Sequence, residues 1–141
     1  MIVTRGYVRE EFARLLAIND ICYTGVQRPS PAEFQGMLAN STVFAARSQT
    51  VDRTPILGFA IVRPENIPYL WSIAVLPAYW GRGFGSTLLR EVISVYPEMY
   101  LHVKPDNPAQ KLYFDFGFRV SYIAKRWYKN EGDALYMRRG L

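Results

Sequence analysis

The chain has 141 residues, of which 50% are hydrophobic and 21% are charged, and these proportions fit one folded domain rather than a disordered, collagen-like or coiled-coil protein. Seventeen Lys and Arg against twelve Asp and Glu give a net charge of +5, which suits an anionic small molecule or surface. No run of five basic residues occurs, so nucleic acid is disfavoured. The single cysteine, Cys22, excludes an internal disulfide and the multi-cysteine zinc sites.

Neither a membrane segment nor a signal peptide is expected. The uncharged apolar runs fall far short of the ~20 residues that cross a bilayer. The first residues, Met1 to Thr4, lack the basic and apolar regions of a secretion signal. We therefore expect a cytoplasmic protein that folds as a single domain over residues 1–141, as a monomer or a homodimer.

Two helices are expected after a first short strand and before the first hairpin. Residues 10–19 carry apolar side chains at helical spacing, and Ser30-Pro31-Ala32-Glu33 is a capping box with proline at the first helical position. Strands are expected over Thr42–Ala46 and Ile56–Val62, joined by the polar Arg47–Pro55 connection.

The second half of the chain alternates strands with helices. In chain order we expect an apolar strand over Tyr69–Val75, a helix that Pro97 closes, a short strand over Tyr100–Val103, a helix from Asn107 through Phe116, and a hairpin of Phe118–Tyr128 with Ala134–Met137. The first of these strands is almost continuously apolar, which predicts a central position buried on both faces. The expected fold class is α/β, with the element order β-α-α-β-β-β-α-β-α-β-β.

Three glycines, Gly81, Gly83 and Gly85, lie at alternate positions between the central strand and the next helix. Glycine permits positive φ and a close approach of the backbone, so successive amides of this turn can bind one phosphate, and Arg82 adds a positive charge. The turn fits neither the P-loop nor the dinucleotide fingerprint. From the turn alone, a phosphate site and a tight structural turn both stay open.

Two segments resemble the GNAT superfamily of N-acetyltransferases. The run Ile73 to Gly85 is similar to its acetyl-CoA motif, Gln/Arg-x-x-Gly-x-Gly/Ala, with Trp80 in the Gln/Arg position. Downstream, the residues that resemble the family segment Asn-x-x-Ala-x-x-Leu-Tyr-x-x-x-Gly-Phe are Asn107, Ala109, Leu112-Tyr113 and Gly117-Phe118. The resemblance covers roughly residues 56–137 and implies the GNAT fold, a mixed and mostly antiparallel sheet with flanking helices.

The resemblance further implies that acetyl-CoA is the cosubstrate and binds where the sheet splays beside the central strand. The main chain of Ile73, Ala74 and Val75 is expected to hold the pantetheine arm much as an added strand would. The phosphate-binding residues implied in the same way are Gly81, Arg82, Gly83, Phe84, Gly85 and Ser86. Asn107 completes the set, although it lies one residue closer to Tyr113 than the family pattern has it, so Asp106 is the alternative at that position.

Tyr113 and His102 are the catalytic residues that the resemblance implies. Tyr113 matches the family tyrosine that protonates the leaving thiolate, a role that suits a phenol with a pKa of about 10; packing against a helix face is the alternative. His102, the only histidine, stands where the protein N-terminal acetyltransferases often place their base, and its ordinary pKa of about 6.5 suits that role. Glu65, a relayed water and a structural His102 stay open.

The expected acceptor is an amine, and two observations favour a peptide or protein N-terminus. Residues 127–137 resemble the close of the ribosomal-protein alanine acetyltransferase branch, although a cross-strand hairpin also explains them. Deprotonation at pH 7 costs about 1.1 kcal/mol for an α-amine but about 4.6 kcal/mol for a lysine. The alternatives are a small-molecule amine, such as an amino acid, polyamine or drug, and a non-catalytic acyl-CoA-binding module.

Acceptor choice is expected to depend on the loop of residues 23–30 and on the final hairpin. Direct attack of the amine within a ternary complex is expected, because Cys22 is remote from both motifs in sequence and no other thiol is present. No metal site is expected.

Overall fold

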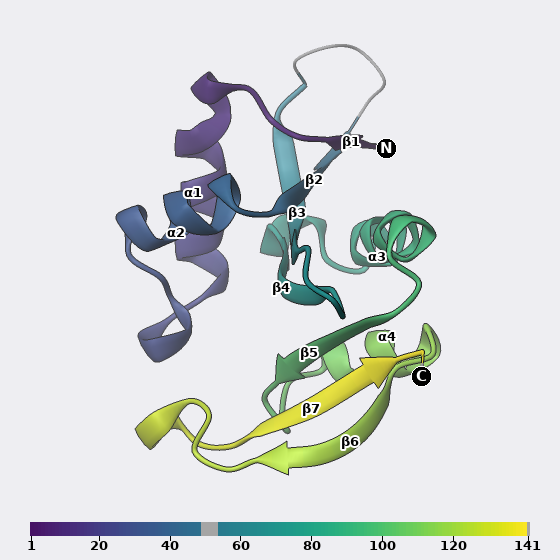
Figure 1. The fold of residues 1–141 in the computed structure, drawn as a ribbon. Helices are drawn as coiled ribbons and strands as arrows, with labels where there is room; N and C mark the ends of the chain where they lie inside the picture. Colours follow the sequence, from purple (N-terminus) through teal and green to yellow (C-terminus); the bar gives the residue numbers. More distant parts are fainter. Residues whose placement is uncertain (49–53, 141) are drawn as a thin grey trace.

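A computed structural model describes residues 1–48 and 54–140 (Figure 1). Its strands are β1 (Ile2–Arg5), β2 (Thr42–Arg47), β3 (Ile56–Arg63), β4 (Tyr69–Val75), β5 (Met99–Val103), β6 (Arg119–Ala124) and β7 (Ala134–Arg139). Its α-helices are α1 (Phe12–Cys22), α2 (Pro31–Ala39), α3 (Phe84–Val95) and α4 (Ala109–Asp115), and its 3-10 turns are η1 (Arg9–Glu11), η2 (Gly25–Gln27), η3 (Pro77–Tyr79) and η4 (Lys129–Glu131). The predicted order of strands and α-helices is confirmed. Most of the expected Arg47–Pro55 connection, residues 49–53, lies outside the described residues.

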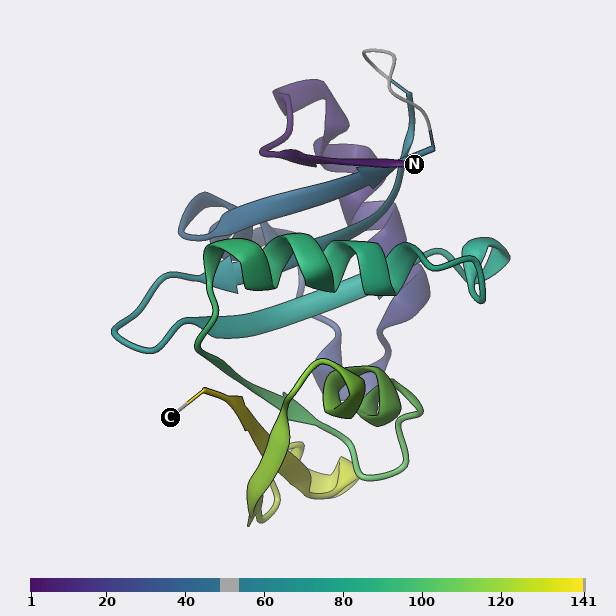
Figure 2. The same ribbon diagram turned by 90° about the vertical axis from the view of Figure 1, so that its right-hand side faces the viewer.

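The strands form one sheet in the order β1-β2-β3-β4-β5-β7-β6. Every neighbouring pair is antiparallel except β4 and β5, which run parallel and share only the Tyr69–Tyr100 pairing. The two strands diverge beyond that point and divide the sheet into a β1–β4 half and a β5–β7 half (Figures 1 and 2). The splay expected beside the central strand is therefore present.

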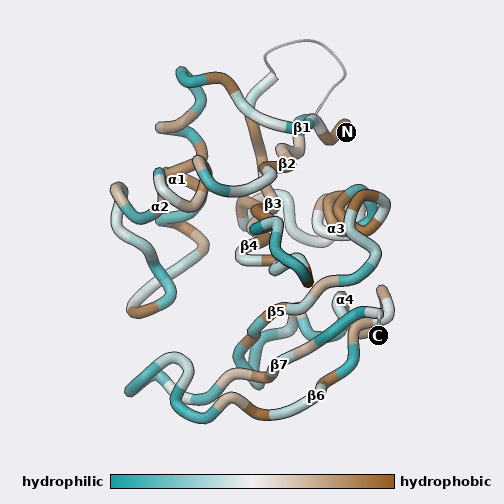
Figure 3. Tube along the Cα trace, in the orientation of Figure 1, coloured by the Kyte–Doolittle hydropathy of each residue, from teal (hydrophilic) through white to brown (hydrophobic). Residues whose placement is uncertain are grey.

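Helices cover both faces of the first half of the sheet, with α1 and α2 on one face and α3 on the other (Figure 1). Because side chains alternate along a strand, Val43 and Ala45 of β2 join the core beneath α1 and α2, whereas Phe44 and Ala46 join the core beneath α3. Figure 3 shows the result: β3 is mainly hydrophobic, and the turn between β6 and β7 is mainly hydrophilic. None of the described helices is long and apolar enough to cross a bilayer.

The helix starts follow from local capping. The capping box expected at Ser30 is confirmed, since Ser30 Oγ accepts the Glu33 N–H at 3.2 Å and the Glu33 carboxylate accepts the Ser30 N–H at 2.9 Å. The first helix begins at Phe12 rather than at residue 10. A 3-10 turn precedes it, in which the Glu11 carboxylate accepts the Val8 N–H at 3.0 Å.

The strand expected over residues 118–128 ends at Ala124, four residues early. Arg126 and Lys129 both adopt a φ of +54°, which takes the chain out of the extended conformation. The Asp133 carboxylate accepts the Arg126 N–H at 2.8 Å and stabilises the turn. Local hydrogen bonding thus replaces the last part of the predicted strand with a compact turn, which includes η4.

Candidate functional site

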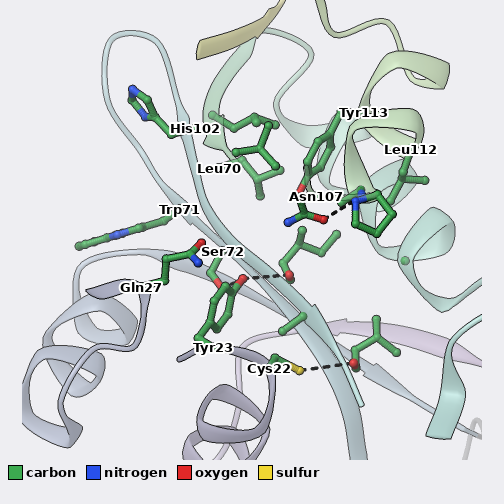
Figure 4. Close-up of a pocket in the computed structure, with 18 of the residues that line it drawn as sticks. Cys22, Tyr23, Gln27, Leu70, Trp71, Ser72, His102, Asn107, Leu112 and Tyr113 are labelled. Carbon is green, nitrogen blue, oxygen red and sulfur yellow. Dashed lines mark hydrogen bonds between the residues drawn. The ribbon is translucent and has the colours of Figure 1, made fainter. Parts of the chain in front are cut away.

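A cavity of about 880 Å³ lies where β4 and β5 separate (Figure 4). Its walls come from β4, β5, the glycine turn before α3, the start of α4, the segment that follows α1, and the turn between β6 and β7. Segments from both halves of the sheet therefore meet around one space.

The register between β3 and β4 determines which main-chain groups of β4 reach this cavity. Ala74 lies opposite Phe59, and the Leu76 N–H donates to the Leu57 carbonyl at 2.9 Å, so the even-numbered residues pair with β3. The main-chain groups of Ile73 and Val75 consequently face the splay, as expected. Those of Ala74 face β3, so the main-chain contact expected for Ala74 is wrong, although this residue also lines the cavity.

Side chains already bind the two carbonyls at this edge. The Tyr23 hydroxyl donates to the Ile73 carbonyl at 3.0 Å, while the Trp80 indole N–H and the Cys22 thiol donate to the Val75 carbonyl at 2.7 and 3.4 Å. Trp80, which departs from the family motif, thus supports β4. The N–H groups of Ile73 and Val75 are left as the main-chain donors of the free edge.

The glycine turn adopts the conformation that its sequence predicts. Gly81 and Gly83 have φ values of +77° and +82°, and Gly83 is the N-cap of α3. The first turn of a helix leaves amide N–H groups without partners within the helix, so the amides of Phe84, Gly85 and Ser86 are available to an anion. These glycines, Phe84 and Ser86 all line the cavity.

Two residues of the turn differ in the part that they can contribute. The Phe84 side chain is buried in the core, so only its main chain can serve the site. Arg82 does not line the cavity, and its guanidinium carbon lies 5.4 Å from the centroid of the Tyr79 ring. A contact between Arg82 and a phosphate stays a prediction.

Tyr113 and Asn107 approach each other inside the cavity (Figure 4). Tyr113 lies on α4, is 7% exposed and packs edge-on against Phe118, with 5.7 Å between ring centroids. Burial raises its pKa, so the hydroxyl stays protonated at neutral pH. Asn107 Oδ1 accepts the Ala109 N–H at 2.9 Å, and Asn107 rather than Asp106 lines the cavity. Which of the two residues takes the family position stays a prediction.

His102 lies on β5 at the far wall of the cavity, within an aromatic cluster. Its ring stacks on Trp127 with centroids 3.7 Å apart, and its Nδ1 lies 3.0 Å from the Tyr69 hydroxyl. Desolvation by this half-buried setting lowers the pKa of His102 to about 4. The expectation of an imidazole pKa near 6.5 is therefore wrong, and His102 is neutral at pH 7.

The structure also places the other candidate residues. Glu65 does not line the cavity; it pairs with Arg63 and accepts the Tyr100 hydroxyl at 2.9 Å, so its position does not support a role as base. Cys22, by contrast, lines the cavity, and its remoteness in sequence was misleading. Burial raises the pKa of the Cys22 thiol, which disfavours its thiolate form.

Several cavity residues were not predicted one by one. They are aromatic or polar side chains beside the part of the cavity where the acceptor is expected, which we call the acceptor end: Tyr23, Gln27, Trp71, Trp127 and Tyr128. Most of them lie in the two segments on which acceptor choice was expected to depend, the loop of residues 23–30 and the final hairpin. Trp71 escaped notice because it reads as an ordinary apolar strand residue, although the register shifts at this point of β4.

Comparisons with known proteins agree with this geometry. Residues 12–118 match the profile of the acetyltransferase (GNAT) family. Over 84 residues, the chain is 36% identical to the ribosomal protein bS18 alanine N-acetyltransferase of Haemophilus influenzae, a match that covers 55% of this chain and 58% of that protein. The chain thus spans about half the length of the curated relatives that it matches.

Solved structures share the whole fold. The ribosomal-protein-S18-alanine N-acetyltransferase of Escherichia coli superposes with a TM-score of 0.81 at 22% identity, covering 98% of this chain and 93% of that one. A GNAT family acetyltransferase of Elizabethkingia anophelis, crystallised with acetyl-CoA bound, superposes with a TM-score of 0.74 at 19% identity, covering 99% and 98%.

Proposed function

Because the chain belongs to the acetyltransferase (GNAT) family, we propose that it transfers the acetyl group of acetyl-CoA to the α-amine at the N-terminus of a peptide or protein. One observation carries the proposal. The free edge of β4 and the glycine turn before α3 border the same cavity, into which the Tyr113 hydroxyl also points (Figure 4). Donors for a thioester carbonyl, for a phosphate and for a leaving sulfur are thus held around one space.

Main-chain groups hold the donor. The amides at the start of α3, from Gly83 to Ser86, bind the phosphates, and the helix dipole favours their negative charge. The Ile73 and Val75 N–H groups bind the arm and polarise the thioester carbonyl, because a preorganised donor stabilises the oxygen as it gains charge. Acetyl-CoA supplies the activated acetyl group.

Two side chains handle the protons. The acceptor nitrogen forms a bond to the thioester carbonyl carbon, and the carbon–sulfur bond then breaks. Tyr113 donates its hydroxyl proton to the leaving sulfur, and His102 receives the proton that the amine loses, directly or through water. For His102 Nε2 to accept that proton, Nδ1 must carry the ring hydrogen and donate to the Tyr69 oxygen 3.0 Å away.

An α-amine acceptor is favoured over a lysine whatever the strength of the base, including a His102 whose pKa burial lowers to about 4. A weak base can take the proton of a group with a pKa of about 7.8 far more readily than that of one near 10.4. The names of the Haemophilus influenzae and Escherichia coli proteins add a direction, since both specify alanine on a ribosomal protein. We therefore take an N-terminal alanine as the first acceptor to test.

Paired peptides test the acceptor class. Two peptides share one sequence that begins with Ala and contains one Lys; one has a free N-terminus and a blocked lysine, and the other has the reverse. We expect the free α-amine to be acetylated at least about tenfold faster at pH 7, because its deprotonation costs less. Mass spectrometry with labelled acetyl-CoA measures both rates. Faster acetylation of the lysine peptide contradicts the proposal.

The variant His102→Gln tests the base. We expect kcat/KM for an α-amine peptide to fall by about sevenfold at pH 7, because only about one seventh of such amines are neutral there. Above pH 8.5 the deficit should shrink, since the amine has already lost its proton. The parent should show no inflection near pH 6.5, because burial lowers the pKa of His102 to about 4.

Profiles of kcat/KM against pH from 6 to 9.5 for both proteins decide this point. A deficit of equal size at pH 7 and at pH 9 would assign His102 a structural role in the stack with Trp127. Trp71→Phe, a change in a cavity residue whose side chain does not titrate, is the comparison for a general disturbance of the acceptor end.

A further inference from the structure

Two short turns from opposite ends of the chain meet at the acceptor end of the cavity. η2 follows α1, η4 lies between β6 and β7, and Figure 1 shows them one above the other at the lower left. Val26 and Gln27 of η2 and Lys129 of η4 all line the cavity. Whatever holds these turns together therefore shapes the space that an acceptor enters.

One side chain makes that connection. Glu131 Oε2 accepts the main-chain N–H of Val26 at 2.9 Å, across 105 positions of the sequence. Its other oxygen, Oε1, accepts from Lys104 Nζ at 3.4 Å, and Lys104 follows directly after β5. The carboxylate thus links three segments around the cavity. Such a charge-assisted bond to a main-chain amide is stronger than a neutral one.

Gly25 is shaped to receive this carboxylate. Its φ is +58°, a conformation that favours glycine, and a Cβ added there would lie 2.7 Å from Glu131 Cδ. Real Cβ atoms do not approach another atom so closely, so the Glu131 carboxylate occupies the space of a Gly25 side chain. The absence of a side chain at Gly25 therefore makes room for the carboxylate of Glu131, which is far away in the sequence.

We infer that Glu131 is a positioning residue for the acceptor, which acts by fixing the Gly25–Gln27 turn over the cavity. The inference rests on the proposed function. The bridge touches neither β4 nor the glycine turn, so it leaves the donor site unchanged. A turn held in its bound conformation before the ligand arrives improves affinity, because less freedom is lost on binding.

The test compares Glu131→Ala with Glu131→Gln. For Glu131→Ala we expect weaker binding of a peptide that begins with Ala. Both its Kd for the CoA-bound protein and its KM should rise about tenfold. The KM for acetyl-CoA and kcat should stay within about twofold. Glu131→Gln should rescue binding, because the amide oxygen can still accept the Val26 N–H. Glu10→Ala, which removes an exposed carboxylate from η1, is the control.

A double-mutant cycle with Gly25→Ala adds a second arm. In the parent, the new methyl group displaces the Glu131 carboxylate, so peptide affinity should fall as in Glu131→Ala. In the Glu131→Ala background the same change should have a smaller effect, since the contact is already absent and only the strain of the positive φ remains. Full additivity of the two changes overturns the inference.

The outcomes separate this inference from the proposed function. A parent that acetylates the peptide, with an unchanged Kd and KM in folded Glu131→Ala, overturns the positioning role alone. A parent that neither binds nor acetylates N-terminal peptides overturns the proposed function and the positioning role together. The positioning role is also overturned if the KM for acetyl-CoA rises as much as the KM for the peptide, because a general disturbance of the protein then explains both increases.

Discussion

Replacing Tyr113 with Phe is expected to lower kcat by roughly 10² to 10⁴, the usual range for the loss of a general acid. The ring can keep its contact with Phe118, because only the hydroxyl is removed, so folding and acetyl-CoA affinity should change little. The raised pKa of Tyr113 keeps the hydroxyl protonated throughout the neutral range, and a proton donor is what the leaving sulfur requires. Steady-state kinetics with calorimetric titration of acetyl-CoA separates the two effects.

Two further Tyr→Phe variants make the result specific. Tyr122 lies exposed on β6 and stacks on Tyr136, away from the cavity, so Tyr122→Phe should leave kcat unchanged. Tyr128 lines the cavity, and burial raises its pKa to about 12. If kcat falls strongly in Tyr128→Phe and stays normal in Tyr113→Phe, then Tyr128 rather than Tyr113 is the general acid.

Replacing Gly83 with Val is expected to abolish detectable acetyl-CoA binding, a loss of at least about 100-fold. A Cβ at this position meets no protein atom within 4 Å, so crowding within the protein is not the reason. The reason is the φ of +82°, which a β-branched residue avoids strongly. The turn must change its shape, and the amides at the start of α3 then lose their common direction.

Titration calorimetry of the folded variant measures this effect, with circular dichroism as the check on folding. Gly36→Val is the matched control, because Gly36 lies within α2 and an added Cβ there also meets nothing within 4 Å. Its φ lies outside the left-handed region, so acetyl-CoA affinity should be unchanged. An unaltered affinity in folded Gly83→Val would remove the glycine turn from the donor site.

Features encoded in short stretches of sequence could be predicted. The capping box at Ser30 and the glycine turn before α3 depend on neighbours a few positions away, so their residue types identify them. The apolar run of Tyr69–Val75 predicted the central position of β4 in the sheet, but the expected burial on both faces is wrong, because Trp71, Ile73 and Val75 are only half-buried. Two motifs in the right order then identified the family, and with it the splay between β4 and β5.

What the sequence alone determined about this protein is therefore the order of its elements and the choice of Gly83, Asn107 and Tyr113, which all line one cavity. Only the tertiary structure decided which distant residues meet. The Cys22 thiol donates to the Val75 carbonyl, and the Glu131 carboxylate accepts the Val26 N–H. Partners separated by 53 or 105 positions leave no periodic pattern, because their contact depends on how whole elements pack.

The pKa of His102 shows the same division. Its residue type and its place on a strand were evident from the sequence, and an ordinary pKa of about 6.5 followed from the residue type alone. The half-buried setting lowers that value to about 4, because desolvation disfavours the charged ring. Desolvation arises only when β5 and the turn after β6 are packed together, so the tertiary structure decided it.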